Sequence, residues 1–215
     1  MQNQYAKYLK ILGITKHRPD IDSLTNLISA HLAKIPFENI SKLYYLKTYN
    51  LKTIPDFELY IDGISNYHFG GTCYSNNFYL NKLLTYLGYE VRLCSADMNE
   101  PDVHVVNIVT LSGQEYLVDV GYAAPFLNPM PLYMHDTYEI VHGADKYMLY
   151  PKNNKGYSIL KMFRDGEEKH RYVVKPEARS IDRFNDVIKD SFREEATFLN
   201  SLLLVRFESS LSVRI

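Results

Sequence analysis

The spacing of apolar residues changes at Gly88, and this change limits the folds open to the chain. Before Gly88, apolar residues recur every three or four positions, which predicts amphipathic helices. After it, β-branched and aromatic residues alternate with polar ones in short segments separated by Asn, Pro, Ser and Gly, which predicts an antiparallel meander. The sequence therefore predicts an α+β protein, with helices first and strands afterwards.

The N-terminal part contains three clear helical patterns. Residues 5–12 and 24–32 each carry one apolar face. Residues 72–87 form a third pattern, in which Thr72 is suited to the N-cap and Gly88 to the position after the last turn. The third helix is therefore expected to begin at Cys73.

The remainder of the chain predicts strands and a mixed end. Strands are expected at residues 89–96, 103–110, 115–120, 138–141, 147–150, 157–163 and 170–175. A last helix is expected at about residues 181–195, before an apolar run at 202–207. No internal repeat or low-complexity linker is visible.

Composition narrows the class of partner. The 215 residues are 46% hydrophobic, with 24 basic and 25 acidic side chains and no Lys/Arg block. Such a chain can bury a core and carries no footprint of nucleic-acid or anionic-membrane binding, so a small molecule or a protein is the expected partner. No apolar run approaches the roughly 18 residues of a membrane span. The oligomeric state cannot be read from the sequence.

The start of the chain and its cysteines indicate a compartment. Met1–Leu12 contains lysines and tyrosines where a secretory signal would have an apolar centre. Only two cysteines occur, Cys73 and Cys94. A reduced, cytoplasmic setting is therefore expected.

Cys73 follows two glycines and precedes a helical pattern, in the octapeptide GGTCYSNN at residues 70–77. A helix N-terminus offers unpaired N–H groups and partial positive charge, both of which favour a thiolate. The glycines allow backbone or substrate to come close. Cys73 is thus a candidate nucleophile, although most free cysteines are simply small buried apolar residues. Cys94 lies in an apolar strand pattern and is expected to be of that structural kind.

A hairpin predicted at Ser112-Gly113 places a base and an acid together. If these two residues form the turn, Leu111 faces Gln114, and the numbers of any two paired residues add up to 225. His104 and Asp119 are then diagonal neighbours on one face of the sheet. Their Cα atoms would lie roughly 7–8 Å apart, within reach of one hydrogen bond between the side chains. Such a pair would orient an imidazole toward a thiol. Read singly, each residue is an ordinary strand or turn residue; with Cys73 they suggest a Cys-His-Asp unit.

Three segments in order resemble the arylamine N-acetyltransferase family, including its N-hydroxyarylamine O-acetyltransferases. Residues 35–40 read IPFENI and match the family's IPFEN signature. Residues 70–73 match its glycine-glycine-cysteine block, with Asn77 also at a matching place. The His strand and VDVGF strand of the family correspond to HVV at 104–106 and LVDVGY at 117–122. The resemblance covers about residues 35–132.

The resemblance implies a ping-pong acetyl transfer. Cys73 would take the acetyl group from acetyl-CoA as a thioester and pass it to an arylamine, hydrazine or N-hydroxyarylamine. His104 would carry the proton and Asp119 would orient it. Phe37, Gly121 and Tyr122 would contribute to the substrate pocket, although plain core packing would also explain Phe37 and Tyr122. No metal is implied.

The resemblance also implies an architecture. It predicts a cysteine-protease-like helical bundle at residues 1–88 that carries the nucleophile. An antiparallel β-barrel at 89–178 would carry His104 and Asp119, and a reduced α/β lid would follow at 179–215. Phe69 stands where the family has an arginine, so Glu38 needs another partner. His68 is the nearest candidate.

Other classes of protein use similar residues. A thiol hydrolase or transglutaminase-like protein also places Cys on a helix and His-Asp on strands. A metal site made of His68, Cys73, His104 and Asp119 would have suitable ligand types, but the chain shows no zinc-type spacing of Cys or His. A catalytically inactive binding homologue on the same scaffold is the third alternative. The reactivity of Cys73 near neutral pH would separate an enzyme from an inactive homologue. Transfer of acetyl from acetyl-CoA, as opposed to amide hydrolysis, would separate an acetyltransferase from a thiol hydrolase.

Overall fold

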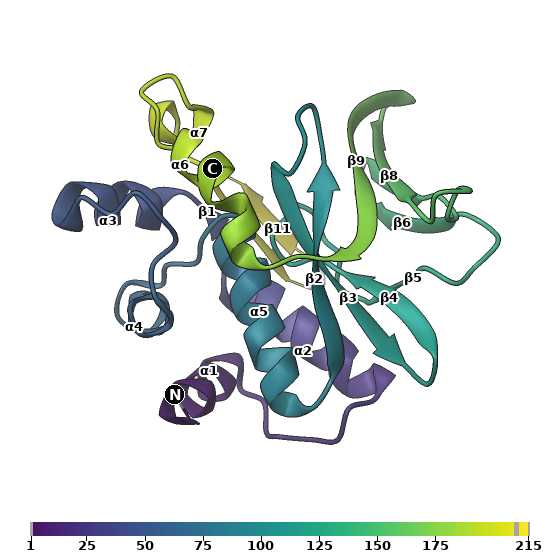
Figure 1. The fold of residues 1–215 in the computed structure, drawn as a ribbon, viewed down its shortest axis with the longest axis horizontal. Coiled ribbons are helices and arrows are strands. Elements are labelled where there is room, and N and C mark those ends of the chain that lie inside the picture. Colours follow the sequence, from purple (N-terminus) through teal and green to yellow (C-terminus); the bar gives the residue numbers. More distant parts are fainter. Residues whose placement is uncertain (1, 209–210, 215) are drawn as a thin grey trace.

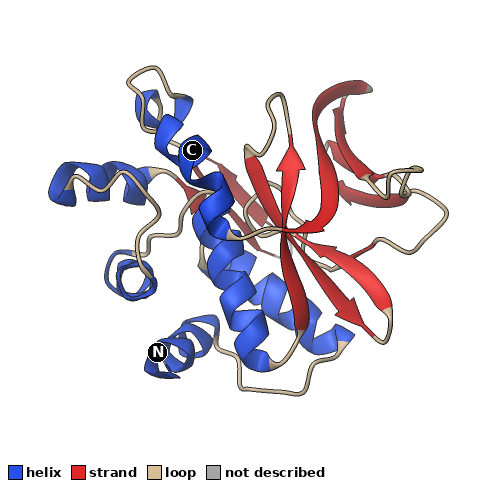
Figure 2. Cartoon of the chain, viewed as in Figure 1, coloured by secondary structure: helices blue, strands red, loops and turns tan. Residues whose placement is uncertain are grey.

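The structure is a computed structural model, and it describes residues 2–208 and 211–214. Figure 1 shows helices gathered on one side and a large bent sheet on the other, with α5 (Cys73–Leu87) between them. Figure 2 separates the same two parts by secondary structure. The order of helices followed by strands confirms the expected α+β class.

Five helices form the N-terminal part. They are α1 (Gln2–Leu12), α2 (Ile21–Lys34), α3 (Ile40–Tyr49), α4 (Phe57–Tyr67) and α5 (Cys73–Leu87). Helix α5 begins after Thr72 and ends at Gly88, whose φ of 92° is the left-handed conformation that glycine adopts without strain. Its leucines Leu80, Leu83 and Leu84 are fully buried. This central helix packs directly on the sheet through β2 and β3.

An eight-stranded antiparallel sheet forms the other part, in the order β5-β4-β3-β2-β9-β8-β7-β6. Its strands are β2 (Glu90–Asp97), β3 (His104–Leu111), β4 (Gln114–Val118), β5 (Met130–Pro131), β6 (Tyr138–His142), β7 (Asp145–Leu149), β8 (Ser158–Arg164) and β9 (Glu167–Ala178). The sheet curls into a nearly closed barrel around an apolar interior that includes Phe126, Tyr147 and Tyr172. This is the expected barrel.

The β3–β4 hairpin has the predicted register. Leu111 pairs with Gln114, and the ladder continues to Asn107 opposite Val118. The turn residues Ser112 and Gly113 have φ values of 50° and 77°, as a two-residue type I′ turn requires. The chain therefore leaves β4 at Asp119 on the side of the sheet that faces α5.

The segment after the barrel differs from the expected helix. A 3₁₀ turn (Ile181–Phe184) leads into a short α6 (Asn185–Asp190), and a separate α7 (Thr197–Asn200) follows. The helix ends at Asp190 because Ser191 is held from outside: its carbonyl and hydroxyl oxygens accept hydrogen bonds of 2.7 and 2.6 Å from the Lys42 ammonium. A tertiary contact thus overrides the local helical pattern.

A second, small sheet joins the C-terminal segment to residues 37–38, between α2 and α3. Strand β10 (Leu204–Glu208) lies between β1 (Phe37–Glu38) and β11 (Leu211–Arg214). The apolar run expected at 202–207 is therefore mostly a strand. The boundaries at residues 88 and 178 between independent domains stay a prediction. Within the described residues, no helix is long and apolar enough to cross a membrane.

Candidate active site

The loop before Cys73 is fixed by strand β1. Gly71 forms an isolated bridge with Phe37, in which Glu38 N–H donates 3.1 Å to Gly71 O. A Cβ added to Gly70 would lie 1.9 Å from the carbonyl oxygen of Pro36, so only glycine allows this approach. The IPFEN segment and the two glycines together set the position at which α5 begins, and Cys73 is its first residue.

Glu38 is 1% exposed and finds its partners nearby. Its carboxylate accepts hydrogen bonds from Ser41 N–H at 2.8 Å, from Ser41 Oγ at 2.5 Å and from Gly70 N–H at 3.0 Å. The expectation that His68 would serve is wrong, because His68 is exposed and ends α4. Two backbone N–H groups and a hydroxyl satisfy the buried charge without an arginine.

Phe69 occupies the position of the family's arginine and belongs to an aromatic cluster. Its ring lies 5.5 Å from Tyr44, 5.9 Å from Tyr45 and 5.2 Å from Tyr67, measured between ring centroids. Edge and tilted contacts of this kind add to the packing of rings beyond their burial alone. An apolar contact with α3 and α4 therefore replaces an ionic one at this point.

His104 and Asp119 form a buried pair. His104 Nε2 lies 2.8 Å from Asp119 Oδ2, and the residues are 2% and 1% exposed. Burial lowers the pKa of His104, but the charge of Asp119 and the hydrogen bond to it, with a contribution from the Cys73 side chain, raise it above its ordinary value. Burial opposes the ionisation of Asp119, yet His104 in particular lowers its pKa. The geometry thus favours an imidazolium beside a carboxylate.

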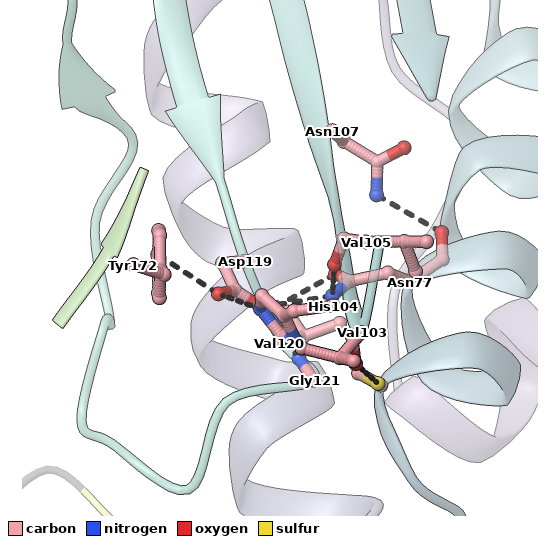
Figure 3. Close-up of polar contacts among 10 residues, drawn as sticks. Asn77, Val103, His104, Val105, Asn107, Asp119, Val120, Gly121 and Tyr172 are labelled. Carbon is pink, nitrogen blue, oxygen red and sulfur yellow. Dashed lines mark hydrogen bonds and ion pairs between the residues drawn. The ribbon is translucent and has the colours of Figure 1, made fainter. Parts of the chain in front are cut away.

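The Asp119 carboxylate is saturated with donors (Figure 3). Oδ1 accepts from Asn77 Nδ2 at 2.8 Å and from Gly121 N–H at 2.9 Å. Oδ2 accepts from Tyr172 Oη at 3.0 Å in addition to His104. A carboxylate with two bonds on each oxygen is held in one orientation and stays ionised. His104 Nδ1 is thereby left to face the nucleophile.

Asn77 joins the nucleophile helix to the sheet. It lies one turn after Cys73 on α5, and besides Asp119 its Nδ2 donates 2.7 Å to Val105 O. Its Oδ1 accepts from Val120 N–H at 3.0 Å (Figure 3). One amide therefore fixes the spacing between the helix that carries Cys73 and the strand ends that carry the His-Asp pair.

Gly121 permits this close docking. A Cβ at this position would lie 2.6 Å from Cys73 Cα and 2.6 Å from Asn77 Nδ2. No larger residue fits between the strand end and the start of α5. Gly121 is therefore first a packing glycine, and it also borders the cavity described next.

A cavity of about 450 Å³ opens at the thiol. The residues expected at the site, Asp119 excepted, all line it: Phe37, Cys73, His104, Gly121 and Tyr122. Further lining residues that sequence reasoning did not identify include Met98, Tyr147, Met162, Arg164 and Phe198. Most of these are apolar or aromatic, so the cavity suits a flat apolar ligand. The Cys73 sulfur lies 3.9 Å from Val103 O at its inner end.

The C-terminal segment closes this cavity and is attached through Asn39. Asn39 Nδ2 donates to Phe198 O at 2.8 Å and to Ser201 O at 2.6 Å, and its Oδ1 accepts from Leu203 N–H at 2.8 Å. Phe198 and Leu203 both line the cavity. Asn39, the last polar residue of the IPFEN segment, thus attaches residues 198–203 to the start of α3.

Cys94 behaves as expected for a structural cysteine. It is fully buried in β2, and burial raises the pKa of its thiol to about 12. Both cysteines are free thiols. In the part of the chain that the structure describes, no cluster of three His, Cys, Asp or Glu side chains has the geometry of a metal site.

The protein consists of a helical bundle packed against a nearly closed barrel, with Cys73, His104 and Asp119 at the junction. This fold and site place it in the class of α+β proteins with a triad-like thiol site. The sequence profile of the N-acetyltransferase family matches residues 20–213 of this chain. The chain therefore belongs to the arylamine N-acetyltransferase family.

Individual relatives agree with this assignment. An arylamine N-acetyltransferase of Mycolicibacterium smegmatis is 30% identical over 162 residues, which cover 66% of this chain and 58% of that protein. Proansamycin X synthase of Amycolatopsis mediterranei is 33% identical over 120 residues, which cover 52% of this chain and 45% of that protein. The chain thus spans about half the length of the curated relatives it matches.

A solved structure shares the fold. The arylamine N-acetyltransferase of Bacillus cereus, which has a Cys-His-Glu catalytic triad, superposes with a TM-score of 0.79 over 100% of this chain and 86% of that one, at 22% identity.

Proposed function

We propose that the protein transfers an acetyl group from acetyl-CoA, through a thioester on Cys73, to an arylamine, hydrazine or N-hydroxyarylamine. The observation that carries the proposal is the shared cavity: Cys73 and His104 line one space of about 450 Å³, and His104 is bonded to a buried carboxylate. Family membership agrees with acyl transfer. The free thiols suit a reduced compartment such as the cytoplasm.

In the first half-reaction, the Cys73 thiolate attacks the carbonyl carbon of the acetyl thioester. The bond between that carbon and the coenzyme A sulfur breaks, and the departing sulfur takes the proton from the His104 imidazolium. Asp119 holds the imidazolium through Nε2, so Nδ1 carries the mobile proton at the thiol side. The product is acetyl-Cys73 and free coenzyme A.

In the second half-reaction, the acceptor nitrogen attacks the acetyl carbon of the thioester. His104, now neutral, removes the proton from the nitrogen, and the sulfur of Cys73 leaves as a thiolate. The acceptor must approach through the cavity of about 450 Å³, called the main cavity below, because His104 lines it. We infer that Phe37 and Tyr122 hold its aromatic ring. Tyr122 is itself fixed by stacking on Phe126, with ring centroids 5.8 Å apart and planes within 1°.

Intact-mass analysis tests the proposal. After mixing with acetyl-CoA, the protein should gain about 42 Da, one acetyl group, and Cys73→Ser should gain no thioester. Cys94→Ser is the matched control and should acetylate like the wild type. Addition of an arylamine should then remove the adduct and yield the amide. Absence of an adduct would contradict the proposal, and loss of the adduct to water at the same rate with and without amine would indicate a thiol hydrolase.

A further inference from the structure

A second cavity is lined by Cys73 but not by His104. It has a volume of about 270 Å³. It is lined by Lys42, Thr72, Cys73, Tyr74, Val103, Val187, Asp190, Ser191 and Phe198. Cys73, Val103 and Phe198 also line the main cavity, whereas His104 lines only the main one. Cys73 therefore borders both a cavity that His104 lines and a cavity that it does not line.

Lys42 supplies the only cation among the residues lining the second cavity that the structure describes. Its ammonium donates hydrogen bonds to Ser191, as described above, and lies 4.0 Å from the centroid of the Phe192 ring. An ammonium has three donors, so one remains after these two bonds. The structure therefore holds the cation in place and leaves it able to bind a further acceptor.

No carboxylate pairs with Lys42 among the side chains that the structure describes. Asp190 lines the same cavity, but it is bonded to Arg193 at 2.7 Å and its side chain is 54% exposed. A partly buried cation without an anion is unusual, because burial disfavours the charge. Burial lowers the pKa of Lys42 to about 8, and the negative charge of Cys73 opposes that effect.

The charge near Lys42 changes during the proposed reaction. A Cys73 thiolate provides a negative charge beside the cavity, and acetylation removes it because a thioester is neutral. An acyl group with a distal carboxylate would instead return a negative charge to the same space. The acceptor and the leaving coenzyme A both need His104 and so occupy the main cavity, which leaves the second cavity for the chain of the acyl group.

We propose that the second cavity is an acyl-chain site in which Lys42 binds the distal carboxylate of a dicarboxylic acyl group, such as malonyl or succinyl, carried on Cys73. This inference rests on the proposed function. The Cys73 sulfur bonds to the thioester carbon of the donor, the bond from that carbon to the coenzyme A sulfur breaks, and the leaving sulfur takes the His104 proton. The distal carboxylate is unchanged and accepts a hydrogen bond from Lys42.

The test compares acetyl-, malonyl- and succinyl-CoA as donors to the intact protein, with adduct formation followed by mass. The expected gains are about 42, 86 and 100 Da, all on Cys73. In Lys42→Met, the ratio of malonyl to acetyl acylation rates should fall by about tenfold or more, whatever the absolute acetyl rate. Lys42→Arg retains the charge and should hold the ratio within about threefold. Lys47→Met, an exposed lysine on the same helix, is the matched control.

The outcomes separate the two proposals. An acetyl adduct without any malonyl or succinyl adduct would overturn the acyl-chain site while supporting acetyl transfer. A ratio that is the same in Lys42→Met and the wild type would also overturn the role of Lys42. No adduct from any of the three donors would overturn the proposed function, and the acyl-chain site with it.

Discussion

Asn77 donates a hydrogen bond of 2.8 Å to Asp119, across the junction between the helices and the barrel. The nucleophile and the His-Asp pair come from different parts of the chain, so their spacing depends on contacts of this kind. Because Asn77 lies one turn after Cys73 on α5, a shift of the helix relative to Asp119 moves Cys73 and Asn77 together. We therefore expect the reactivity of the thiol to depend on Asn77, a residue outside the proposed reacting atoms.

Asp119→Asn should nearly abolish acetylation while leaving the fold intact. Without the carboxylate, His104 loses the charge that favours its protonated form and its orientation. The rate of acetyl adduct formation should fall about 1,000-fold or more. Asp62→Asn, an exposed position on α4, is the matched control and should react like the wild type. A rate for Asp119→Asn within tenfold of the wild type would show that the pair is not needed for the chemistry.

Asn77→Ala should lower both stability and thiol reactivity. It leaves Asp119, Val105 O and Val120 N–H short of partners in a buried site, which is expected to cost about 2–4 kcal/mol in the free energy of unfolding. Asn81→Ala, one turn further along α5, removes a single partly buried bond to Asn107 and should cost about 1 kcal/mol. Chemical denaturation and the rate of iodoacetamide labelling check both effects. Equal losses in the two variants would contradict the special role of Asn77.

Gly121→Ala should separate the strand end from α5. The added methyl group would meet Cys73 Cα and Asn77 Nδ2 at 2.6 Å, so the backbone must move. We expect a loss of about 1–3 kcal/mol and a fall in acetylation of at least about tenfold. Gly113→Ala is the comparison: it strains a residue with φ of 77° but meets no atom within 4 Å, so it should cost stability without affecting acetylation. Acetylation of Gly121→Ala at the wild-type rate would refute the packing argument.

Asn39→Ala should loosen the lid. Three hydrogen bonds of its side chain hold residues 198–203 over the main cavity. Hydrogen exchange of the Leu203 amide should therefore speed up by about tenfold or more, because its acceptor is the Asn39 side chain. Asn66→Ala, an exposed position on α4, should leave that exchange unchanged. Unaltered exchange in Asn39→Ala would mean that other contacts hold the segment.

His31 should make the protein sensitive to mild acid. It is fully buried, only its Nδ1 has a partner, the Tyr8 hydroxyl at 3.1 Å, and burial lowers its pKa to about 3. The unfolded chain takes up this proton below about pH 6.5, so the stability of the fold is full above that pH and falls as the pH drops toward 3. His31→Gln keeps a polar partner for Tyr8 and removes the titration.

The measurement is the melting temperature of both proteins at about pH 7.5 and about pH 4.5. Between these values, His31→Gln should gain about 2 kcal/mol relative to the wild type. His17→Gln, at an exposed position, is the control for the substitution itself. A constant difference between His31→Gln and the wild type at both pH values would mean that His31 does not titrate as its burial implies.

Local patterns in the sequence were enough to predict α5 and the β3–β4 hairpin. Both depend on short-range rules: Gly88 ends the helix, and the two-residue turn at Ser112-Gly113 sets the parity of the strands. Thr72 does precede the helix, but its side chain makes no capping hydrogen bond. That parity alone places His104 and Asp119 on one face. The core of the site was therefore predictable.

Contacts between distant segments were not predictable. Tyr172 reaches Asp119 only because β9 pairs with β2. The local sequence of β9 does not indicate which strand it pairs with. The helix expected to reach Glu195 stops at Asp190 because Lys42, far away in sequence, takes the oxygens of Ser191. Glu38 likewise took backbone partners whose positions depend on how β1 crosses the glycine loop. Each miss is a tertiary contact that local propensity does not encode.

The division of the site between α5 and the barrel also sets an order of events during synthesis. Cys73 is synthesised before His104 and Asp119, and well before Tyr172, the last partner of the carboxylate. Until the barrel docks on α5, the thiol has no neighbouring imidazole to accept its proton. In the proposed mechanism, the thiol of the nascent chain therefore lacks its base, and the docking that completes the fold supplies it.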